Sequence, residues 1–276
     1  MKNHFNLQID PQNWSSGLIA SLSALRQSWR QDWIGLVAVL GACQQVLGLQ
    51  DHGKSNDLQA LRIRTLNRYA VQIAQCMDQP DTPQPAYHNS LHTADVLVSL
   101  TTLIKIQIQN SMDVDKLWVA GLLAAAIGHD FAHPGGVNQY PSEIESNSVR
   151  SLKAHVDDSE LDPIDLERVE QLILSTDVRV VPANHREVSS TDFFWGLPWS
   201  SVLLNEADIL ASTTMEFGPA SCLSLSTEWA AAGVQDSHAV ATHRGWLQFL
   251  KSTQFSSPSS IALGLPDQVQ RLIDSH

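Results

Sequence analysis

Two histidines and an aspartate stand together at the end of a long apolar run. His129 and Asp130 are adjacent and follow the apolar residues 117–127, and His133 comes four residues after His129. Pro134 and two glycines then stop the helix. Imidazole nitrogens and carboxylate oxygens are common metal ligands, and a carboxylate can bridge two ions. This stretch therefore predicts a divalent metal site at the end of a buried helix.

A second group of the same residue types precedes it in the chain. His88, His92 and Asp95 are spaced i, i+4 and i+7, which places them on one face of a helix predicted over residues 87–107. Two histidines one turn apart are suited to chelation. They are equally typical of a solvated helix face, so both interpretations stay open on spacing alone.

Asp208 completes a candidate metal site. It lies with Glu206 in a largely apolar helical segment, residues 199–215, where an unpaired buried carboxylate would be costly. His92, His129, Asp130 and Asp208 thus come from three predicted helices, and helix bundles build metal sites from facing helices. The alternative is three unrelated features: a polar helix face, a helix cap and a buried ion pair.

The segments that would position these residues are predicted to be helical. Few segments alternate as strands do, so we expect an all-α, compact multi-helix bundle with the metal site between its helices. No linker divides the chain, which favours one domain over residues 1–276. We expect helices at residues 14–29, 33–49, 58–77, 87–107, 115–130, 139–156, 163–176, 199–215, 219–232, 237–251 and 266–273, and loops at 51–56, 78–86, 176–190 and 252–260.

The composition narrows the possible partners. The net charge of -12 argues against a general nucleic-acid binder, which would present a basic face. Neither a secretory signal nor an apolar stretch long enough to span a bilayer is evident, so we expect no membrane partner. The three cysteines (Cys43, Cys76 and Cys222) are widely spaced, which favours reduced thiols and a cytoplasmic location. The oligomeric state stays open.

The two histidine motifs resemble a known family. Residues 87–96 read YHNSLHTADV and residues 129–138 read HDFAHPGGVN, and an Ala-Asp pair follows at 207–208. The order H…HD…D is that of the HD superfamily of metal-dependent phosphohydrolases. The two long motifs are similar to those of the class I 3′,5′-cyclic-nucleotide phosphodiesterase catalytic domain. The resemblance is clear over residues 87–138 and extends to about 250, whereas residues 1–60 are unmatched and are expected to pack on the same domain.

The resemblance implies the roles of the metal ligands. His92, His129, Asp130 and Asp208 would bind the tighter ion, expected to be zinc. Asp130 would bridge to a second ion, magnesium or manganese, which is otherwise held mainly by water. A hydroxide between the two ions would attack phosphorus.

It also implies roles for neighbouring residues. His88 would be the general acid that protonates the leaving ribose oxygen, and His133 would hold water near the ions. Asp95 would either orient the motif or form a charge pair on the helix face. Glu145 roughly matches a family glutamate that supports the waters of the second ion.

The substrate pocket departs from the family pattern. The family reads the base with a glutamine three residues before a stacking phenylalanine, and the matching residues here are His243 and Trp246. These two residues, with Tyr87 of the first motif, are the candidate substrate-binding residues. Trp246 is equally typical of a core aromatic residue. Ala132 and Ala211 also replace polar residues of the family.

The resemblance implies hydrolysis of cyclic AMP or cyclic GMP to the 5′-monophosphate by a divergent member. One alternative is an HD-type phosphohydrolase or nucleotidase that acts on another phosphoester, which the altered base reader favours. A further alternative is a non-catalytic sensor that binds a nucleotide.

Overall fold

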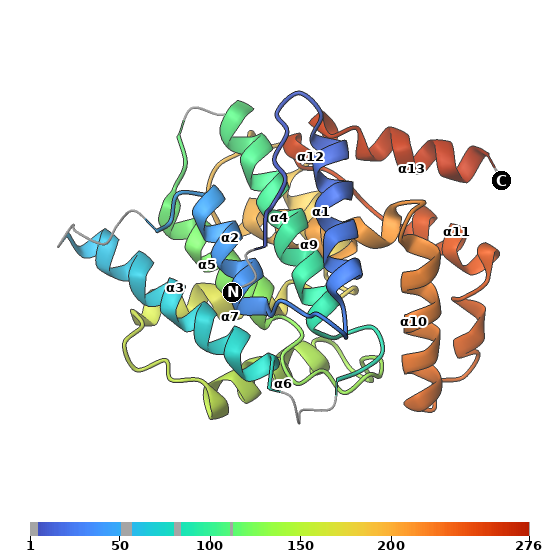
Figure 1. The fold of residues 1–276 in the computed structure, drawn as a ribbon, viewed down its shortest axis with the longest axis horizontal. Helices are drawn as coiled ribbons and strands as arrows, with labels where there is room; N and C mark the ends of the chain where they lie inside the picture. The colour runs from blue at the N-terminus through green and yellow to red at the C-terminus, as the bar shows by residue number, and fades with distance from the viewer. Residues whose placement is uncertain (1–4, 51–56, 80–83, 111–112, 276) are drawn as a thin grey trace.

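The computed structural model describes residues 5–50, 57–79, 84–110 and 113–275, and within these ranges the chain is helical without a β-strand (Figure 1). The all-α prediction is therefore confirmed for the part of the chain that the structure describes. The α-helices are α1 (Trp14–Ser28), α2 (Leu36–Val46), α3 (Leu58–Met77), α4 (Ser90–Asn110), α5 (Lys116–Gly128), α6 (Glu143–His155), α7 (Pro163–Leu174), α8 (Val181–Val188), α9 (Leu197–Leu210), α10 (Gly218–Ala231), α11 (His243–Ser252), α12 (Pro258–Ala262) and α13 (Leu265–Asp274), with short 3₁₀ turns at Ala211–Thr213 and Ser237–Ala239.

Helices α4 and α5 form the centre of the bundle. Helix α5 starts where the Asp115 side chain accepts hydrogen bonds from the Leu117 and Trp118 amides. Its residues from Val119 to Gly128 are buried on every side, as expected of a helix that is apolar all round. Among the described residues, α4 is the one helix long and apolar enough to cross a membrane, but 83% of its most apolar window is buried. It contacts α1, α2, α5 and α9, which is the environment of a core helix.

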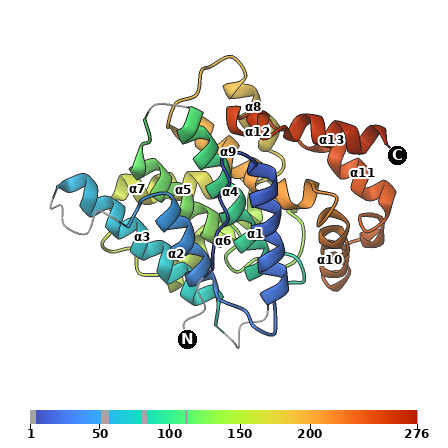
Figure 2. The same ribbon diagram turned by 45° about the horizontal axis from the view of Figure 1, so that its top comes forward.

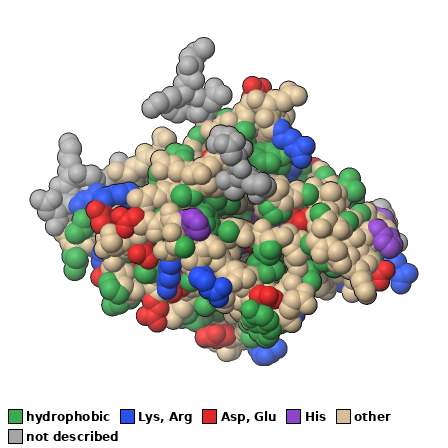
Figure 3. Space-filling view, turned by 90° about the horizontal axis from the view of Figure 1, so that it is seen from below, with side chains coloured by type: hydrophobic (Ala, Val, Ile, Leu, Met, Phe, Trp, Pro, Cys, Tyr) green, Lys and Arg blue, Asp and Glu red, His purple; other side chains and the backbone are tan. Residues whose placement is uncertain are grey.

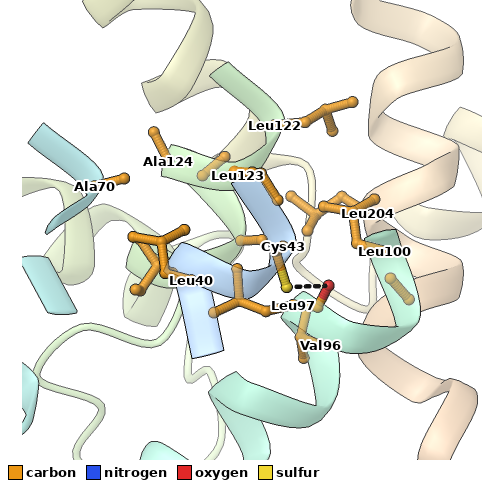
Figure 4. Close-up of a cluster of buried hydrophobic side chains, with 14 of the residues drawn as sticks. Leu40, Cys43, Ala70, Val96, Leu97, Leu100, Leu122, Leu123, Ala124 and Leu204 are labelled. Atoms are coloured by element: carbon orange, nitrogen blue, oxygen red, sulfur yellow. Dashed lines mark hydrogen bonds between the residues drawn. The ribbon is translucent and has the colours of Figure 1, made fainter. Parts of the chain in front are cut away.

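The core between these helices is filled by leucines and small residues (Figure 4). Leu40, Leu97, Leu123 and Leu204 are all fully buried and come from α2, α4, α5 and α9. The Cys43 thiol lies among them, with its Sγ 3.7 Å from the carbonyl oxygen of Leu97. Burial raises the pKa of this thiol to about 12, so it stays protonated and unreactive at neutral pH.

The amino-terminal helices, which the family motifs left unmatched, are bound to α4 by a partly buried ion pair. Both Arg26 guanidinium nitrogens donate to the Asp95 carboxylate at 2.8 Å, and the guanidinium also lies over the Phe217 ring at 4.0 Å. Burial alone would raise the pKa of Asp95, and the positive charge of Arg26 offsets only part of that rise. Asp95 therefore forms an ion pair with α1, and its part in orienting the motif stays a prediction.

Three carboxy-terminal helices form a smaller layer at one side of the bundle. Figures 1 and 2 both show α10, α11 and α13 beside one another there. Their apolar faces meet in a separate cluster that contains Cys222, Trp246, Leu250 and Val269. This layer matters for function because α10 reaches back to the turn before α4.

Three loop and helix predictions differ from the structure. Residues 176–190 were expected to be a loop but contain α8, because Pro182 lies in its first turn, where a missing N–H is tolerated. The helix expected at 237–251 is divided into the 3₁₀ turn and α11, and α12 begins inside the predicted loop 252–260. The loop predicted at 51–56 and part of the one at 78–86 lie outside the described residues.

His185 in α8 gives the fold a pH-dependent element. Its side chain is 5% exposed, and its Nδ1 lies 2.8 Å from Ser256 Oγ. Burial lowers its pKa from 6.5 to about 4. The unfolded chain therefore binds a proton between pH 6.5 and 4 that the folded state does not, so stability is lost as the pH falls through this window.

We expect His185→Gln to reduce this pH dependence, because a neutral amide can replace the imidazole without titrating. Urea unfolding midpoints, measured with a chelator from pH 7 to pH 4.5, should fall less steeply in the variant than in the parent protein. The exposed His238 provides the matched control, and His238→Gln should follow the parent. An unchanged slope in His185→Gln would contradict the assignment.

Candidate active site

His88 lies in the turn before α4, because this helix begins only at Ser90. The Asn89 side chain caps the N-terminus of α4 by accepting hydrogen bonds from the amides of Leu91 and His92, at 2.9 and 3.3 Å. The prediction that His88, His92 and Asp95 share one helix face is therefore wrong. His88 therefore precedes the helix and contacts Glu228 of α10, while His92 lies in the first turn of α4.

The structure brings the four predicted metal ligands together. The Nε2 atom of His92 lies 3.2 Å from Asp130 Oδ2 and 3.0 Å from Asp208 Oδ1. The Nε2 atom of His129 lies 3.1 and 3.5 Å from the same two oxygens. The ligand atoms therefore converge from α4, from the end of α5 and from α9.

The donor set at this point fits a divalent cation. His92 Nε2, His129 Nε2 and Asp130 Oδ2 are buried and have no hydrogen-bond partner. His129 Nδ1 lies 2.9 Å from the Ala126 carbonyl oxygen and donates to it, so Nε2 is the ring atom that faces the carboxylates and is available to a cation. Buried polar atoms are rarely left unpaired. His92, His129 and Asp208 also form a group whose ligand atoms lie within 4.8 Å of one another.

The two carboxylates favour positive charge at this point. Burial disfavours a charged imidazole, but the adjacent carboxylates of Asp130 and Asp208 outweigh it and raise the pKa of His92 to about 9. Conversely, burial would raise the pKa values of Asp130 and Asp208, but the adjacent histidines hold them below the usual range. A bound divalent cation would supply the same positive charge in place of protons, which makes metal binding pH-dependent.

A buried carboxylate holds His88. Glu228 of α10 contacts His88 Nδ1 through one oxygen and accepts the backbone amides of Tyr87 and His88 through the other, at 2.7 and 2.9 Å. Burial alone would raise the pKa of Glu228, but the hydrogen bond from His88 lowers it, so the carboxylate is ionised. Gly135 permits this approach: its φ is +79°, and a Cβ there would lie 3.1 Å from the Glu228 side chain.

His133 stacks on His88 with their ring centroids 3.8 Å apart. Its Nδ1 accepts a hydrogen bond from the Gly135 amide at 3.0 Å, which places the proton on Nε2. Burial and the neighbouring charge of His88 lower its pKa to about 4, so it is neutral at pH 7. His88, His133 and Glu228 have the spacing of a metal site, but His133 Nδ1 is already engaged. The three side chains instead form a hydrogen-bonded and stacked group around the His88 imidazole.

Glu228 was missed by sequence reasoning. It is the sole charged residue of α10, whose sequence is GPASCLSLSTEWAA, and no motif surrounds it. The sequence did contain one signal, a single carboxylate in an otherwise uncharged helix. As argued for Asp208, a carboxylate buried in such a helix needs a partner. Its partner could not be named because 140 positions separate it from His88.

Glu145 lies at the edge of the site. It accepts both hydrogen bonds of the Asn138 side-chain amide, at 3.2 and 3.0 Å. Burial raises its pKa, and the charges of Asp177 and Asp130 raise it further. Asn138 closes the second motif and also accepts the Ile144 amide, so this pair joins the motif to the start of α6. The proposed support of metal-bound water stays a prediction.

The three candidate substrate residues occupy different environments. Tyr87 lies beside His92, with ring centroids 4.6 Å apart, and its hydroxyl contacts Ser212 Oγ at 2.9 Å. His243 is exposed at the start of α11. Trp246 is only 2% exposed, and its indole N–H donates to the Ser212 carbonyl at 3.0 Å. A Cβ on Gly218 would lie 2.4 Å from the same indole nitrogen. This location favours the core-aromatic interpretation of Trp246.

Comparisons with known proteins agree with the motifs. A family profile described as 3′5′-cyclic nucleotide phosphodiesterase matches residues 87–159. The phosphodiesterase domain of the RhoPDE fusion protein from the choanoflagellate Salpingoeca rosetta is similar in structure, with a TM-score of 0.55 and 17% identity, covering 86% of this chain and 88% of that one. Yeast caPDE2 in complex with IBMX aligns with a TM-score of 0.48 and 18% identity, covering 94% of this chain and 70% of that one. The first of these structures shows a shared fold.

Proposed function

We propose that this chain, of which residues 87–159 match the 3′5′-cyclic nucleotide phosphodiesterase family, is a divergent phosphodiesterase that hydrolyses cyclic AMP or cyclic GMP to the 5′-monophosphate. The observation that carries the proposal is the pairing of two groups: four converging metal ligands and, beside them, a histidine held by an ionised glutamate. A cyclic diester needs both, since its phosphorus must be made electrophilic and its ribose oxygen is a poor leaving group.

His92, His129, Asp130 and Asp208 would hold a zinc ion, and Asp130 would be shared with a second ion, magnesium or manganese. Bound there, the ions would lower the pKa of water and neutralise the phosphoryl oxygens. The buried histidine and carboxylate atoms without hydrogen-bond partners support this assignment.

The protein side chains supply the proton. Glu228 fixes the His88 ring through Nδ1, which leaves Nε2 to donate a proton to the leaving ribose oxygen. The neutral His133, with its proton on Nε2, would donate a hydrogen bond to water or to a phosphoryl oxygen.

The test is hydrolysis of both cyclic nucleotides by the purified protein, with zinc and either magnesium or manganese added and the products separated by chromatography. We expect a 5′-monophosphate from at least one substrate. If metal analysis shows bound ions and neither nucleotide is consumed, the proposed activity is wrong.

A second candidate is hydrolysis of another phosphoester by the same metal site. The buried position of Trp246 favours it, because the residue expected to stack on the base is packed in the core. A panel of nucleoside monophosphates and simple phosphate esters, assayed by phosphate release, distinguishes the two. Monoester hydrolysis without diester hydrolysis would support the second candidate.

We also propose a cytoplasmic location, because the three cysteines are free and reduced thiols are typical of that compartment.

A further inference from the structure

We propose that Arg26 of α1 is a positioning residue of the active site, because it fixes the start of α10 and thereby holds Glu228 against His88. This inference rests on the proposed function and adds α1, a helix outside the family motifs, to the parts of the chain on which proton donation depends. Arg26 acts through two contacts, one with the carboxylate of Asp95 and one with the ring of Phe217.

The first contact fixes the guanidinium of Arg26. Both of its terminal nitrogens donate to the Asp95 carboxylate at 2.8 Å, and Nη1 also donates to the Leu22 carbonyl oxygen at 3.1 Å. Figure 3 shows acidic and basic side chains interspersed over the face seen from below, and ion pairs between such exposed groups contribute little. The Asp95 side chain is instead only 8% exposed and belongs to α4. A two-pronged pair with this carboxylate holds both the place and the plane of the guanidinium.

The second contact joins α1 to α10. The Cζ atom of Arg26 lies 4.0 Å from the centroid of the Phe217 ring, within the range of a cation–π interaction. Phe217 directly precedes α10 and is buried in the main hydrophobic core, whereas Cys222, further along the helix, belongs to the carboxy-terminal cluster. Figures 1 and 2 both show α1 on the side of the bundle that faces α10. Phe217 therefore joins the start of α10 to the main bundle, and Arg26 covers its ring.

A small movement at the start of α10 is amplified at Glu228. The larger contacts of this helix are with α11 and with the 3₁₀ turns Ala211–Thr213 and Ser237–Ala239. Glu228 lies eleven residues after Phe217, which is about 16 Å along the helix axis. A rotation of α10 by about 4° at its start would therefore move the Glu228 carboxylate by about 1 Å. A displacement of about 1 Å at a catalytic group can cost about 10²-fold in rate.

Two backbone amides report the position of Glu228 without turnover. The amides of Tyr87 and His88 donate to Glu228 Oε2 at 2.7 and 2.9 Å, and His88 Nδ1 contacts the other oxygen. If α10 shifts, these amides lose their acceptor, and their exchange with deuterium, measured by NMR, should quicken by roughly tenfold. The Leu91 amide, which donates to the Asn89 side chain, is the internal reference and should exchange at an unchanged rate.

Two variants remove the contact in different ways. Arg26→Met removes the guanidinium, and Phe217→Leu removes the ring while leaving the ion pair with Asp95 in place. We expect each to lower kcat for the cyclic nucleotide by roughly 10- to 100-fold, with KM and zinc affinity close to the parent values. Arg26→Lys keeps the charge but cannot pair through two nitrogens, so its kcat should lie between. The double variant Arg26→Met/Phe217→Leu should be no slower than the slower single variant, because both changes act on one contact.

A matched ion pair elsewhere separates positioning from stability. Arg62 of α3 donates to Asp165 of α7 through Nε and Nη2, at 2.7 and 2.6 Å, and the Asp165 side chain is 1% exposed. Removing one partner of a buried pair is destabilising, so Arg62→Met and Arg26→Met should both lower the urea unfolding midpoint. Only Arg26→Met should also lower kcat and quicken exchange at Tyr87 and His88, in assays without urea at temperatures where each variant is folded.

The outcomes distinguish this inference from the proposed function. If Arg26→Met and Phe217→Leu both retain the kcat of the parent and the slow exchange of the two amides, Arg26 has no positioning role. Equal losses of kcat in Arg26→Met and Arg62→Met would show that Arg26 acts on stability alone. If the parent hydrolyses neither cyclic nucleotide, the proposed function is wrong, and amide exchange then decides whether Arg26 positions Glu228.

Discussion

Asp130→Asn should abolish tight metal binding and turnover together. The amide keeps the size of the carboxylate but removes the charge that Oδ2 places 3.2 and 3.1 Å from the Nε2 atoms of His92 and His129. Altering a residue that merely orients a metal ligand costs about 10- to 100-fold in affinity. Loss of a charged, buried ligand should cost more than that, and hydrolysis should fall below detection.

The measurement is zinc affinity by competition with a chromophoric chelator, together with thermal unfolding. Zinc that binds only the folded parent at 100 times its Kd adds about 2.7 kcal/mol of stability, and this increment should disappear in the variant. Asp157→Asn is the matched control, because this exposed carboxylate accepts a hydrogen bond from the Ser159 amide and lies outside the group of metal ligands. Parent-like zinc affinity in Asp130→Asn would show that the ligand set is wrong.

Local sequence signals identified the four side chains that the structure brings together as candidate metal ligands. The apolar run before His129 had to be a buried helix, and Asp208 had to have a partner inside an apolar segment. Both inferences need only the helical period and the cost of burying charge. The structure places Asp208 beside both histidines, because α9 packs directly on α4.

The surroundings of His88, the proposed general acid, could not be predicted in the same way. The helix predicted from residue 87 begins three residues later, at Ser90, because Asn89 was not identified as a capping residue. Glu228 and Arg26 lie 140 and 69 positions from their partners, His88 and Asp95. No local pattern in one sequence links such distant residues. These contacts depend on how α10 and α1 pack, which helical periodicity does not specify.

The substrate side shows a different limit. Spacing alone placed Trp246 where the family has a stacking aromatic, but spacing does not say which face of α11 is covered. The adjacent α10 and α13 provide that information, since Cys222 and Val269 bury the same face as Leu250. An aromatic residue at this spacing can either stack on the base of a substrate or pack in the hydrophobic core. Only tertiary packing distinguishes the two.

His88→Ala should slow hydrolysis of the cyclic nucleotide by about 10²- to 10⁴-fold, which is the usual contribution of a general acid. Zinc affinity should stay at the parent value, because the structure places His88 against Glu228 and His133 and not among the four metal ligands. Steady-state rates on the cyclic nucleotide and a chelator titration measure the two effects separately.

A substrate with a good leaving group identifies the reason for the loss. Bis(p-nitrophenyl) phosphate releases a nitrophenolate that needs no proton, so His88→Ala should hydrolyse it at close to the parent rate. His238→Ala, an exposed histidine outside the site, should leave both rates unchanged. Equal losses on the two substrates would mean that His88 positions the phosphate or the ions and does not donate the proton. Because Glu228 binds Nδ1, a proton-donating role is open to Nε2 alone, and the two substrates together test that atom's function.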